Sequence, residues 1–298
     1  MNEVSISDES IINIPYRNNV GESPFWNPDK NSWYWLDQAG DIYEYNPSKN
    51  QCIKTEIGQR LGSMVLSESG ELVIAGMKSI FSIQGDTVNN IASLEHPHEN
   101  MKFADGRCDR QGRFMVSTMC PDITQQNEWG SWYTVSANNI YKATSEHYII
   151  PNGSAFNAEG NIFYFSETDT DRRQIYKCNY DIDDGIITDI KPFLNLSQDR
   201  SLGRPDGAAI DVDGCYWVCG LDEGVIMRIT PNGKIDRILK TPMKKPTMCS
   251  FGGSDYKTLI VTSLCRGEND LLEDPNGGCV MLVDLGYQGI AEPRFKGV

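Results

Sequence analysis

The sequence has no segment long and apolar enough to cross a membrane and no cluster of basic residues. Its apolar runs all fall short of the roughly 20 residues that a membrane-spanning helix needs, and its N-terminus lacks the basic and apolar regions of a secretory signal. The formal net charge is -14, which would repel nucleic-acid phosphates and anionic lipids. These features predict a cytoplasmic protein that binds neither nucleic acid nor membranes.

Several motifs with a known chemistry are also missing. The 9 cysteines contain no C-x-x-C pair, which argues against a zinc ribbon and favours buried free thiols. There is no G-x-S-x-G elbow, no P-loop and no dinucleotide fingerprint. Residues 179–190 lack the Gly and the final Glu of a calcium loop, so we predict a solvated hairpin turn there. Because no stretch keeps an apolar period of 3.6 residues, little helix is expected.

What the sequence does contain is a repeated strand-and-turn pattern. Short apolar or alternating runs follow turns rich in Gly, Asp or Asn, as in SWYWLD, ELVIAG, RFMVST, NIFYFSE, CYWVCG and TLIVTS. Stepping back eight positions from the turn Gly of each copy, or from Lys30 in the first copy, gives Glu22, Gly62, Ala104, Asn152, Asp206 and a position near Thr247. Spacings of about 40 to 54 residues match propeller blades. We predict an all-β, six-bladed β-propeller with four antiparallel strands per blade, formed by residues 1–298 as a single domain.

In such a fold the equivalent residues of all blades face one central funnel. Glu22, Asn152 and Asp206 would then bring three side-chain oxygen donors together, and two neighbouring carboxylates favour a cation between them. All-oxygen ligation suits calcium first, with magnesium, manganese and zinc as alternatives. The competing interpretation is that Asn152 and Asp206 only form turns before a Gly.

Several longer motifs carry a family resemblance. They are, in chain order, GESPFW, FADGRCDRQGRF, IPNGSAF, GRPDGAAIDVDGCYW, KPTMCSFGG and GYQGIAEPRF. With these motifs the chain resembles, over nearly its whole length, the regucalcin (senescence marker protein), gluconolactonase and luciferin-regenerating-enzyme-like family of six-bladed propellers. In that family the corresponding Glu, Asn and Asp hold one divalent cation, so the resemblance implies Glu22, Asn152 and Asp206 as metal ligands.

The resemblance also implies an activity in carbohydrate metabolism. Family members typically hydrolyse sugar lactones, so we expect a lactonase that converts an aldonolactone to the aldonic acid. The cation would polarise the lactone carbonyl and activate water, with Asp206 as the catalytic general base. The expected partner is a small-molecule sugar lactone, and the expected state is a monomer or a small homo-oligomer.

One departure from the family pattern keeps other functions open. Ala104 and Lys102 stand where the family usually has Asn and Arg, and Lys lacks the planar fork of Arg. The alternatives are a calcium- or metabolite-binding regucalcin-like protein with little or no turnover, a hydrolase of another ester, and a scaffold for protein interactions.

Loops that join second and third strands should shape the pocket. These loops are expected at residues 36–40, 119–130, 166–174, 219–224 and 263–278. The predicted substrate-binding residues are charged or aromatic and lie in or beside the funnel: Lys102, Asp105, Glu128, Trp129, Glu167 and Arg266. The competing interpretation for each loop is a surface connection without a function.

Overall fold

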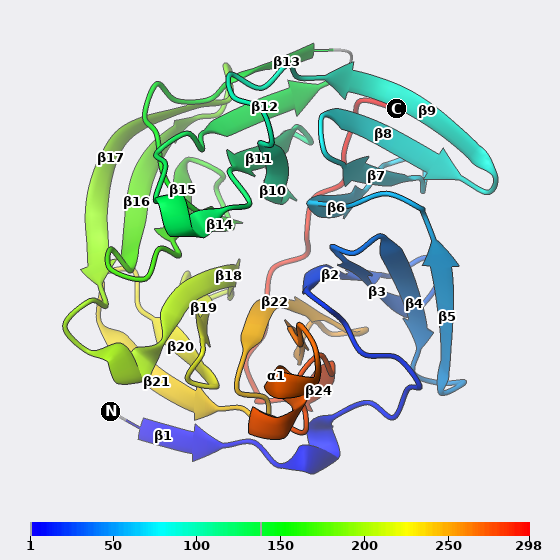
Figure 1. Ribbon diagram of the computed structural model, residues 1–298, viewed down its shortest axis with the longest axis vertical. Helices are drawn as coiled ribbons and strands as arrows, with labels where there is room; N and C mark the ends of the chain where they lie inside the picture. Colours follow the sequence, from blue (N-terminus) through cyan, green and yellow to red (C-terminus); the bar gives the residue numbers. More distant parts are fainter. Residues whose placement is uncertain (1, 138) are drawn as a thin grey trace. The chain divides into compact units, whose positions relative to one another are not determined.

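Six antiparallel sheets form the core of the protein in a computed structural model that describes residues 2–137 and 139–298 (Figure 1). These sheets are the blades of a six-bladed β-propeller, numbered here as blades 1 to 6 in chain order. The predicted fold class is therefore confirmed. The chain divides into two compact units. Unit 1 contains the residues up to Gly58 and Leu196–Ala291, and unit 2 contains Gln59–Asn195 and Glu292–Val298. The single-domain interpretation stays a prediction.

Unit 1 holds blades 1, 5 and 6. Blade 1 consists of β2 (Gly21–Asn27), β3 (Ser32–Asp37), β4 (Asp41–Asn46) and β5 (Gln51–Glu56). Blade 5 consists of β18 (Arg204–Ile210), β19 (Tyr216–Leu221), β20 (Val225–Ile229) and β21 (Ile235–Lys240), and β1 (Asn2–Ser5) pairs with β21 in parallel. Blade 6 consists of β22 (Pro246–Gly252), β23 (Thr258–Ser263) and β24 (Met281–Asp284).

Unit 2 holds blades 2, 3 and 4. Blade 2 consists of β6 (Ser63–Leu66), β7 (Leu72–Ala75), β8 (Ser79–Gln84) and β9 (Thr87–Ser93). Blade 3 consists of β10 (Lys102–Cys108), β11 (Phe114–Met119), β12 (Trp132–Ser136) and β13 (Asn139–Lys142). Blade 4 consists of β14 (Pro151–Phe156), β15 (Ile162–Glu167), β16 (Gln174–Asp181) and β17 (Ile186–Asn195).

Blade 6 takes its outer edge from the beginning of the chain. Ile11 forms an antiparallel bridge with Met281, and the backbone N–H of Ile12 donates to the carbonyl of Val280 at 3.0 Å. The prediction of four strands per blade therefore needs a correction here, because blade 6 has three named strands and a fourth edge made by this bridge. The sequence repeat covers only β22 to β24 of this blade, because the fourth edge comes from a segment more than 200 residues earlier in the chain.

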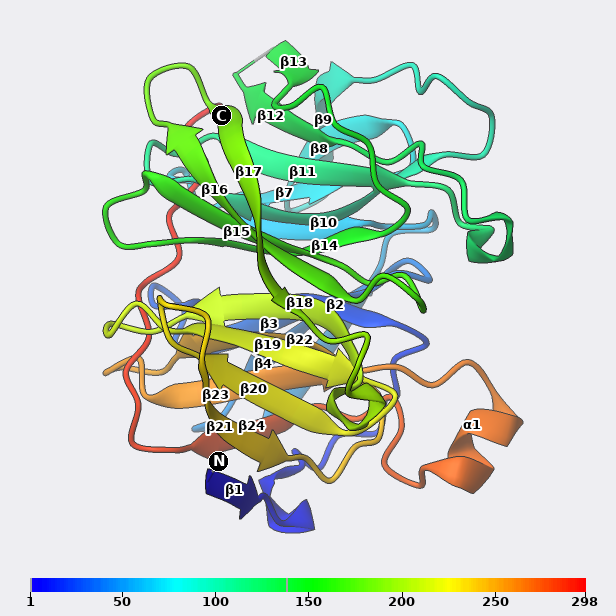
Figure 2. The same cartoon turned by 90° about the vertical axis from the view of Figure 1, so that its left-hand side faces the viewer.

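Helical structure is scarce, as the sequence predicts. The helical segments are η1 (Asp8–Ser10), η2 (Ile123–Gln125), η3 (Arg200–Leu202) and α1 (Glu268–Glu273). Figure 2 shows α1 on a loop that extends beyond the ends of β23 and β24. Within the described residues, no helix has the length and apolar character that spanning a membrane requires.

Aromatic side chains fill the space between neighbouring sheets within each unit. In unit 1, Trp35 is fully buried and stacks on Tyr43 with ring centroids 5.2 Å apart, while Trp217 meets Phe251 edge-on at 5.4 Å. Such ring pairs add to the large apolar area that these residues bury. All 9 cysteines are free thiols and 7 of them are buried, so the prediction of buried thiols is confirmed for most of them.

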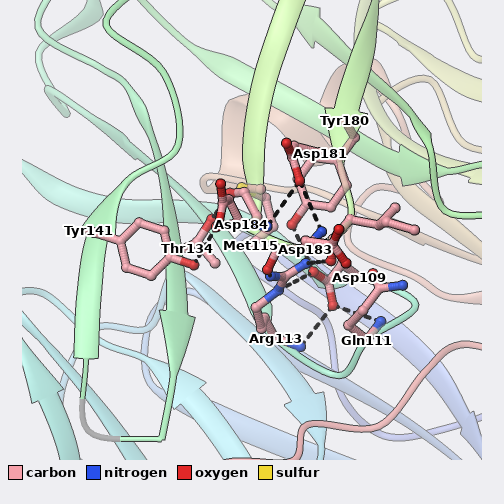
Figure 3. Close-up of polar contacts among 12 residues, drawn as sticks. Asp109, Gln111, Arg113, Met115, Thr134, Tyr141, Tyr180, Asp181, Asp183 and Asp184 are labelled. Atoms are coloured by element: carbon pink, nitrogen blue, oxygen red, sulfur yellow. Dashed lines mark hydrogen bonds and ion pairs between the residues drawn. The ribbon is translucent and has the colours of Figure 1, made fainter.

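A buried carboxylate organises the turn between β10 and β11. Asp109 accepts the Arg113 backbone amide at 2.8 Å and the hydroxyl of Tyr180 at 2.7 Å (Figure 3). Arg113 in turn donates to the carbonyls of Ile182 and Asp183 at 2.7 and 2.8 Å. These carbonyls belong to the connection between β16 and β17, so the predicted hairpin turn is confirmed.

Candidate active site

Two buried carboxylates of unit 1 act on the same thiol. Glu22 lies on β2 and Asp206 on β18, with exposed fractions of 9% and 4%. Burial raises the pKa of the Cys219 thiol well above its usual range, a hydrogen bond with Cys249 adds to the shift, and the charges of Asp206 and Glu22 raise this pKa further. Both carboxylates therefore lie near Cys219. Cys249 lies on β22, and β22 packs against both β2 and β18, which agrees with this placement.

The environment of these carboxylates fits a hard cation. Two negative charges in a buried site destabilise each other unless a positive charge compensates them. Burial and the two nearby carboxylates raise the pKa of the Cys219 thiol, and Glu22 and Asp206 themselves supply oxygen donors. Carboxylate oxygens are what calcium and magnesium prefer. Within the described part of the chain no three His, Cys, Asp or Glu side chains form a cluster, so the fit depends on this carboxylate pair.

Asn152 lies in unit 2 at the second position of β14 and is half-buried. Its side-chain Nδ2 donates to Thr168 Oγ1 at 3.0 Å, which assigns Oδ1 as the end of the amide that could act as a ligand. Asn152 and Asp206 both lie in strands. The competing interpretation, that these two residues serve only as turn formers, therefore loses its support.

A bulge interrupts the first strand of five blades. Two residues of the first strand face one residue of the second, which bends the strand and redirects its side chains. These pairs are Ser23 and Pro24, Ala104 and Asp105, Gly153 and Ser154, Asp206 and Gly207, and Thr247 and Met248.

The residues found by the eight-residue phasing do not all take the same place relative to the bulge. Asp206 is the first residue of its bulge, whereas Glu22 and Asn152 precede theirs. The bulges after Glu22 and Asn152 open with a left-handed residue, Ser23 at φ 50° and Gly153 at φ 66°. A left-handed residue changes the direction of the strand there, and Glu22 and Asn152 lie just before this change.

In unit 2 the strand register places further polar residues at the same end of the blades as Asn152. Lys102 begins β10, pairs with Met119 at the end of β11, and is 8% exposed. Asn152 pairs with Ser166 near the end of β15, and β10 packs against β14. The loops 120–131 and 168–173 leave from these strand ends, and their role in shaping a pocket stays a prediction.

The structure gives two of the predicted substrate-binding residues close backbone partners. Asp105 accepts the amides of Gly106 and Ser154 at 2.7 and 2.8 Å. Glu167, which is fully buried, accepts those of Ile149 and Ile150 at 2.8 and 2.7 Å. Burial raises the pKa of both carboxyl groups, although the amide donors oppose this shift. These contacts favour a role in holding strands and loops in place.

Sequence reasoning did not find this role of acidic residues, although a signal exists. Asp37 in blade 1 accepts the amides of Asn19 and Val20 at 2.6 and 3.1 Å, which is what Glu167 does in blade 4. Both acids end the second strand of their blade, in SWYWLD and IFYFSE. A terminal acid in this strand therefore indicates a carboxylate that binds the segment leading into the first strand.

The other predicted substrate residues lie on more exposed loops. Glu128 forms an ion pair with Arg172, which joins the two loops of unit 2. Trp129 stacks on His98 with ring centroids 3.9 Å apart. Arg266 is exposed, and its backbone amide donates to Asp270 of α1 at 2.7 Å. Arg172 and His98 were not predicted as site residues.

Comparisons with known proteins agree with this fold. Residues 20–265 match the family model described as SMP-30/gluconolactonase/LRE-like region. The chain is 30% identical to a 6-deoxy-6-sulfogluconolactonase of Pseudomonas putida, over 93% of this chain and 95% of that protein. It is also 30% identical to regucalcin of Xenopus laevis, over 98% and 99% of the two chains. The crystal structure of regucalcin from Agrobacterium tumefaciens, described as a calcium-binding protein, superposes with a TM-score of 0.91 at 20% identity and 99% coverage of both chains.

Proposed function

Because this chain belongs to the SMP-30/gluconolactonase/LRE-like family, we propose that it is a lactonase that hydrolyses a sugar lactone with the help of one divalent cation. The observation that carries the proposal is the pair of buried carboxylates, Glu22 and Asp206, whose charges both act on Cys219. Two relatives with lactonase names, one 30% and the other 25% identical to this chain, support the hydrolase class.

The proposed ligands of the cation are Glu22, Asp206 and the side-chain oxygen of Asn152. Calcium is the first candidate because these donors are oxygens and because a structural neighbour is described as a calcium-binding protein. When bound, such a cation polarises a carbonyl and lowers the pKa of water.

The side chains then have separate tasks in the hydrolysis. A carboxylate oxygen of Asp206 accepts a proton from the attacking water as the water oxygen bonds to the lactone carbonyl carbon. The ring C–O bond breaks, its oxygen takes the proton that Asp206 received from water, and the product is the aldonic acid. Lys102 donates from Nζ to a substrate oxygen, while Glu128 and Trp129 contact hydroxyl groups and C–H faces of the sugar. Arg266 stays a proposed contact on the α1 loop.

The substrate is proposed to be an aldonolactone. A relative named as a 6-deoxy-6-sulfogluconolactonase makes a lactone with a sulfonate at C6 a second substrate to compare. The two substrates differ in charge at one position. The ratio of their kcat/KM values therefore measures whether the loops favour or disfavour a negative group at C6 of the substrate.

Acid release from a panel of aldonolactones, corrected for spontaneous hydrolysis, tests the proposal. We expect turnover that disappears with a chelator and returns with added calcium or manganese. Asp206→Ala should remove cation binding and lower kcat/KM by at least about a hundredfold. Asp213→Ala, an exposed acid on the following turn, is the matched control and should change neither. Full turnover of the chelated protein, or of Asp206→Ala, would contradict the proposal.

The second candidate function is cation binding without catalytic turnover. Ala104 and Lys102 in place of the family's usual Asn and Arg favour a cation- or metabolite-binding protein, and relatives named regucalcin cover the whole chain. Tight cation binding by calorimetry together with no acid release from any lactone of the panel would support this candidate over the lactonase.

A further inference from the structure

A polar chain in unit 2 ends on the bulge that follows Asn152. Arg107 on β10 donates from Nε to the carbonyl of Ser154 at 2.7 Å and from Nη1 to the carboxylate of Glu292. Asp105, two residues earlier on β10, accepts the backbone amide of the same Ser154 at 2.8 Å. Side chains of β10 thus bind both backbone polar groups of one residue on β14.

These contacts replace what the bulge removes. Gly153 and Ser154 together face the single residue Phe165, so the regular ladder between β14 and β15 is interrupted at this point. Ser154 is fully buried, and its backbone N–H and C=O therefore need partners other than water. Asp105 and Arg107, each 6% exposed, supply these partners.

The far end of the polar chain is held by the C-terminal segment. Glu292 begins the part of this segment that belongs to unit 2. Three residues later Phe295 is fully buried, donates its backbone amide to the Leu66 carbonyl at 2.9 Å and accepts from the Glu68 amide at 2.9 Å. This docking places the Glu292 carboxylate against Arg107.

We propose that Asp105, Arg107 and Glu292 are positioning residues that fix the bulge of β14 and thereby the direction of the Asn152 amide, so that the C-terminal segment influences cation affinity. The inference rests on the proposed function, because it takes Asn152 as a cation ligand. Buried partners of this kind around a metal ligand typically change metal affinity by about 10- to 100-fold when they are lost.

The test measures cation affinity directly, by titration calorimetry of the full-length protein with calcium alone and with manganese alone. Arg107→Lys keeps the charge and loses the fork, and it should weaken binding by about tenfold. Glu292→Gln should weaken binding in the same direction by a smaller factor. Hydrogen exchange of the Ser154 amide should accelerate in both variants.

Arg113→Lys is the matched control. It makes the same change, keeping the charge and losing the fork, in another ion pair of unit 2, with Asp109 at 2.6 Å, at a turn away from the β14 bulge. It should leave cation affinity and Ser154 exchange unchanged even if the melting temperature falls. Wild-type affinity in Arg107→Lys and Glu292→Gln would overturn the positioning inference alone. No cation binding by the wild-type protein would overturn the proposed function, and the cation coupling with it.

Discussion

Glu167 accepts the backbone amide of Ile150 at 2.7 Å, and Ile150 lies two residues before Asn152. The same carboxylate accepts the amides of Ile149 at 2.8 Å and Asp169 at 3.3 Å. One buried side chain therefore ties the segment that enters β14 to the loop that leaves β15. This relationship makes Glu167 a residue on which the conformation of the proposed site depends.

Replacing Glu167 by Gln should lower the free energy of unfolding by about 1–3 kcal/mol at mildly acidic pH, because the amide group can no longer accept from all of these buried donors. Urea unfolding followed by tryptophan fluorescence measures the change. Glu146→Gln, on an exposed residue of the loop before β14, is the control and should stay within about 0.5 kcal/mol of the wild type. Equal losses in both variants would contradict the role assigned to Glu167.

The wild type and Glu167→Gln should also differ in how their unfolding free energies depend on pH. Burial raises the folded-state pKa of Glu167 above its ordinary value of 4.5, so folding takes up a proton between these two pKa values. The contribution of Glu167 to stability is then complete below the ordinary value and is lost as pH rises through the folded pKa. Unfolding free energies measured from about pH 4 to about pH 8 should show the difference in stability between wild type and Glu167→Gln becoming smaller as pH rises. A constant gap would mean that the carboxyl pKa is the same in both states.

Gly153→Ala should reduce both stability and cation affinity. Gly153 has φ 66°, and a residue with a Cβ in this left-handed region costs about 1–2 kcal/mol. We expect about tenfold weaker cation binding as well, because the bulge that follows Asn152 would relax. Gly70→Ala is the control. Gly70 has φ 87° in a turn with open space around it, so its replacement should cost similar stability and leave cation binding unchanged. Equal cation affinities of Gly153→Ala and Gly70→Ala would show that the bulge after Asn152 does not determine cation binding.

Restoring the family's usual side chain at position 104 should increase activity. Ala104 opens the bulge of β10, the place that Asp206 takes in β18. In Ala104→Asn, one added hydrogen bond of about 1–1.5 kcal/mol corresponds to roughly a tenfold gain in kcat/KM on aldonolactones. Ala104→Leu has a similar volume without hydrogen-bonding groups and should give no gain. If Asn and Leu behave alike, the side chain at this position does not contact the substrate.

The features that could be predicted from the sequence are those that depend on short, continuous segments of the chain. Alternating strands, turns with Gly and the family motifs are local, and they predicted the all-β propeller and its blade count. They also identified Glu22 and Asp206, which the structure buries beside Cys219. The placement of Asn152 in a strand, rather than a turn, agrees with the predicted donor set, and its role as a ligand stays a proposal.

The features that escaped prediction depend on backbone angles or on distant partners. The sequence does not predict the left-handed conformation of Ser23, because Ser seldom adopts it, and this residue opens the bulge that follows Glu22. Arg107 and Glu292 are separated by 185 positions, so only the folded chain brings them together. The holding roles of Asp105 and Glu167 likewise come from backbone amides of other segments.

The bridge between Ile11 and Met281 has a consequence for biosynthesis. Residues 59–195 of unit 2 emerge from the ribosome as one continuous stretch, whereas blade 1 is made long before blades 5 and 6, with which it shares unit 1. The segment around Ile11 is synthesised early and has no partner in blade 6 until Met281 has been made. Unit 1 can thus complete its sheets only after Met281, and a nascent chain stalled before this residue exposes the segment around Ile11 as an unpaired edge.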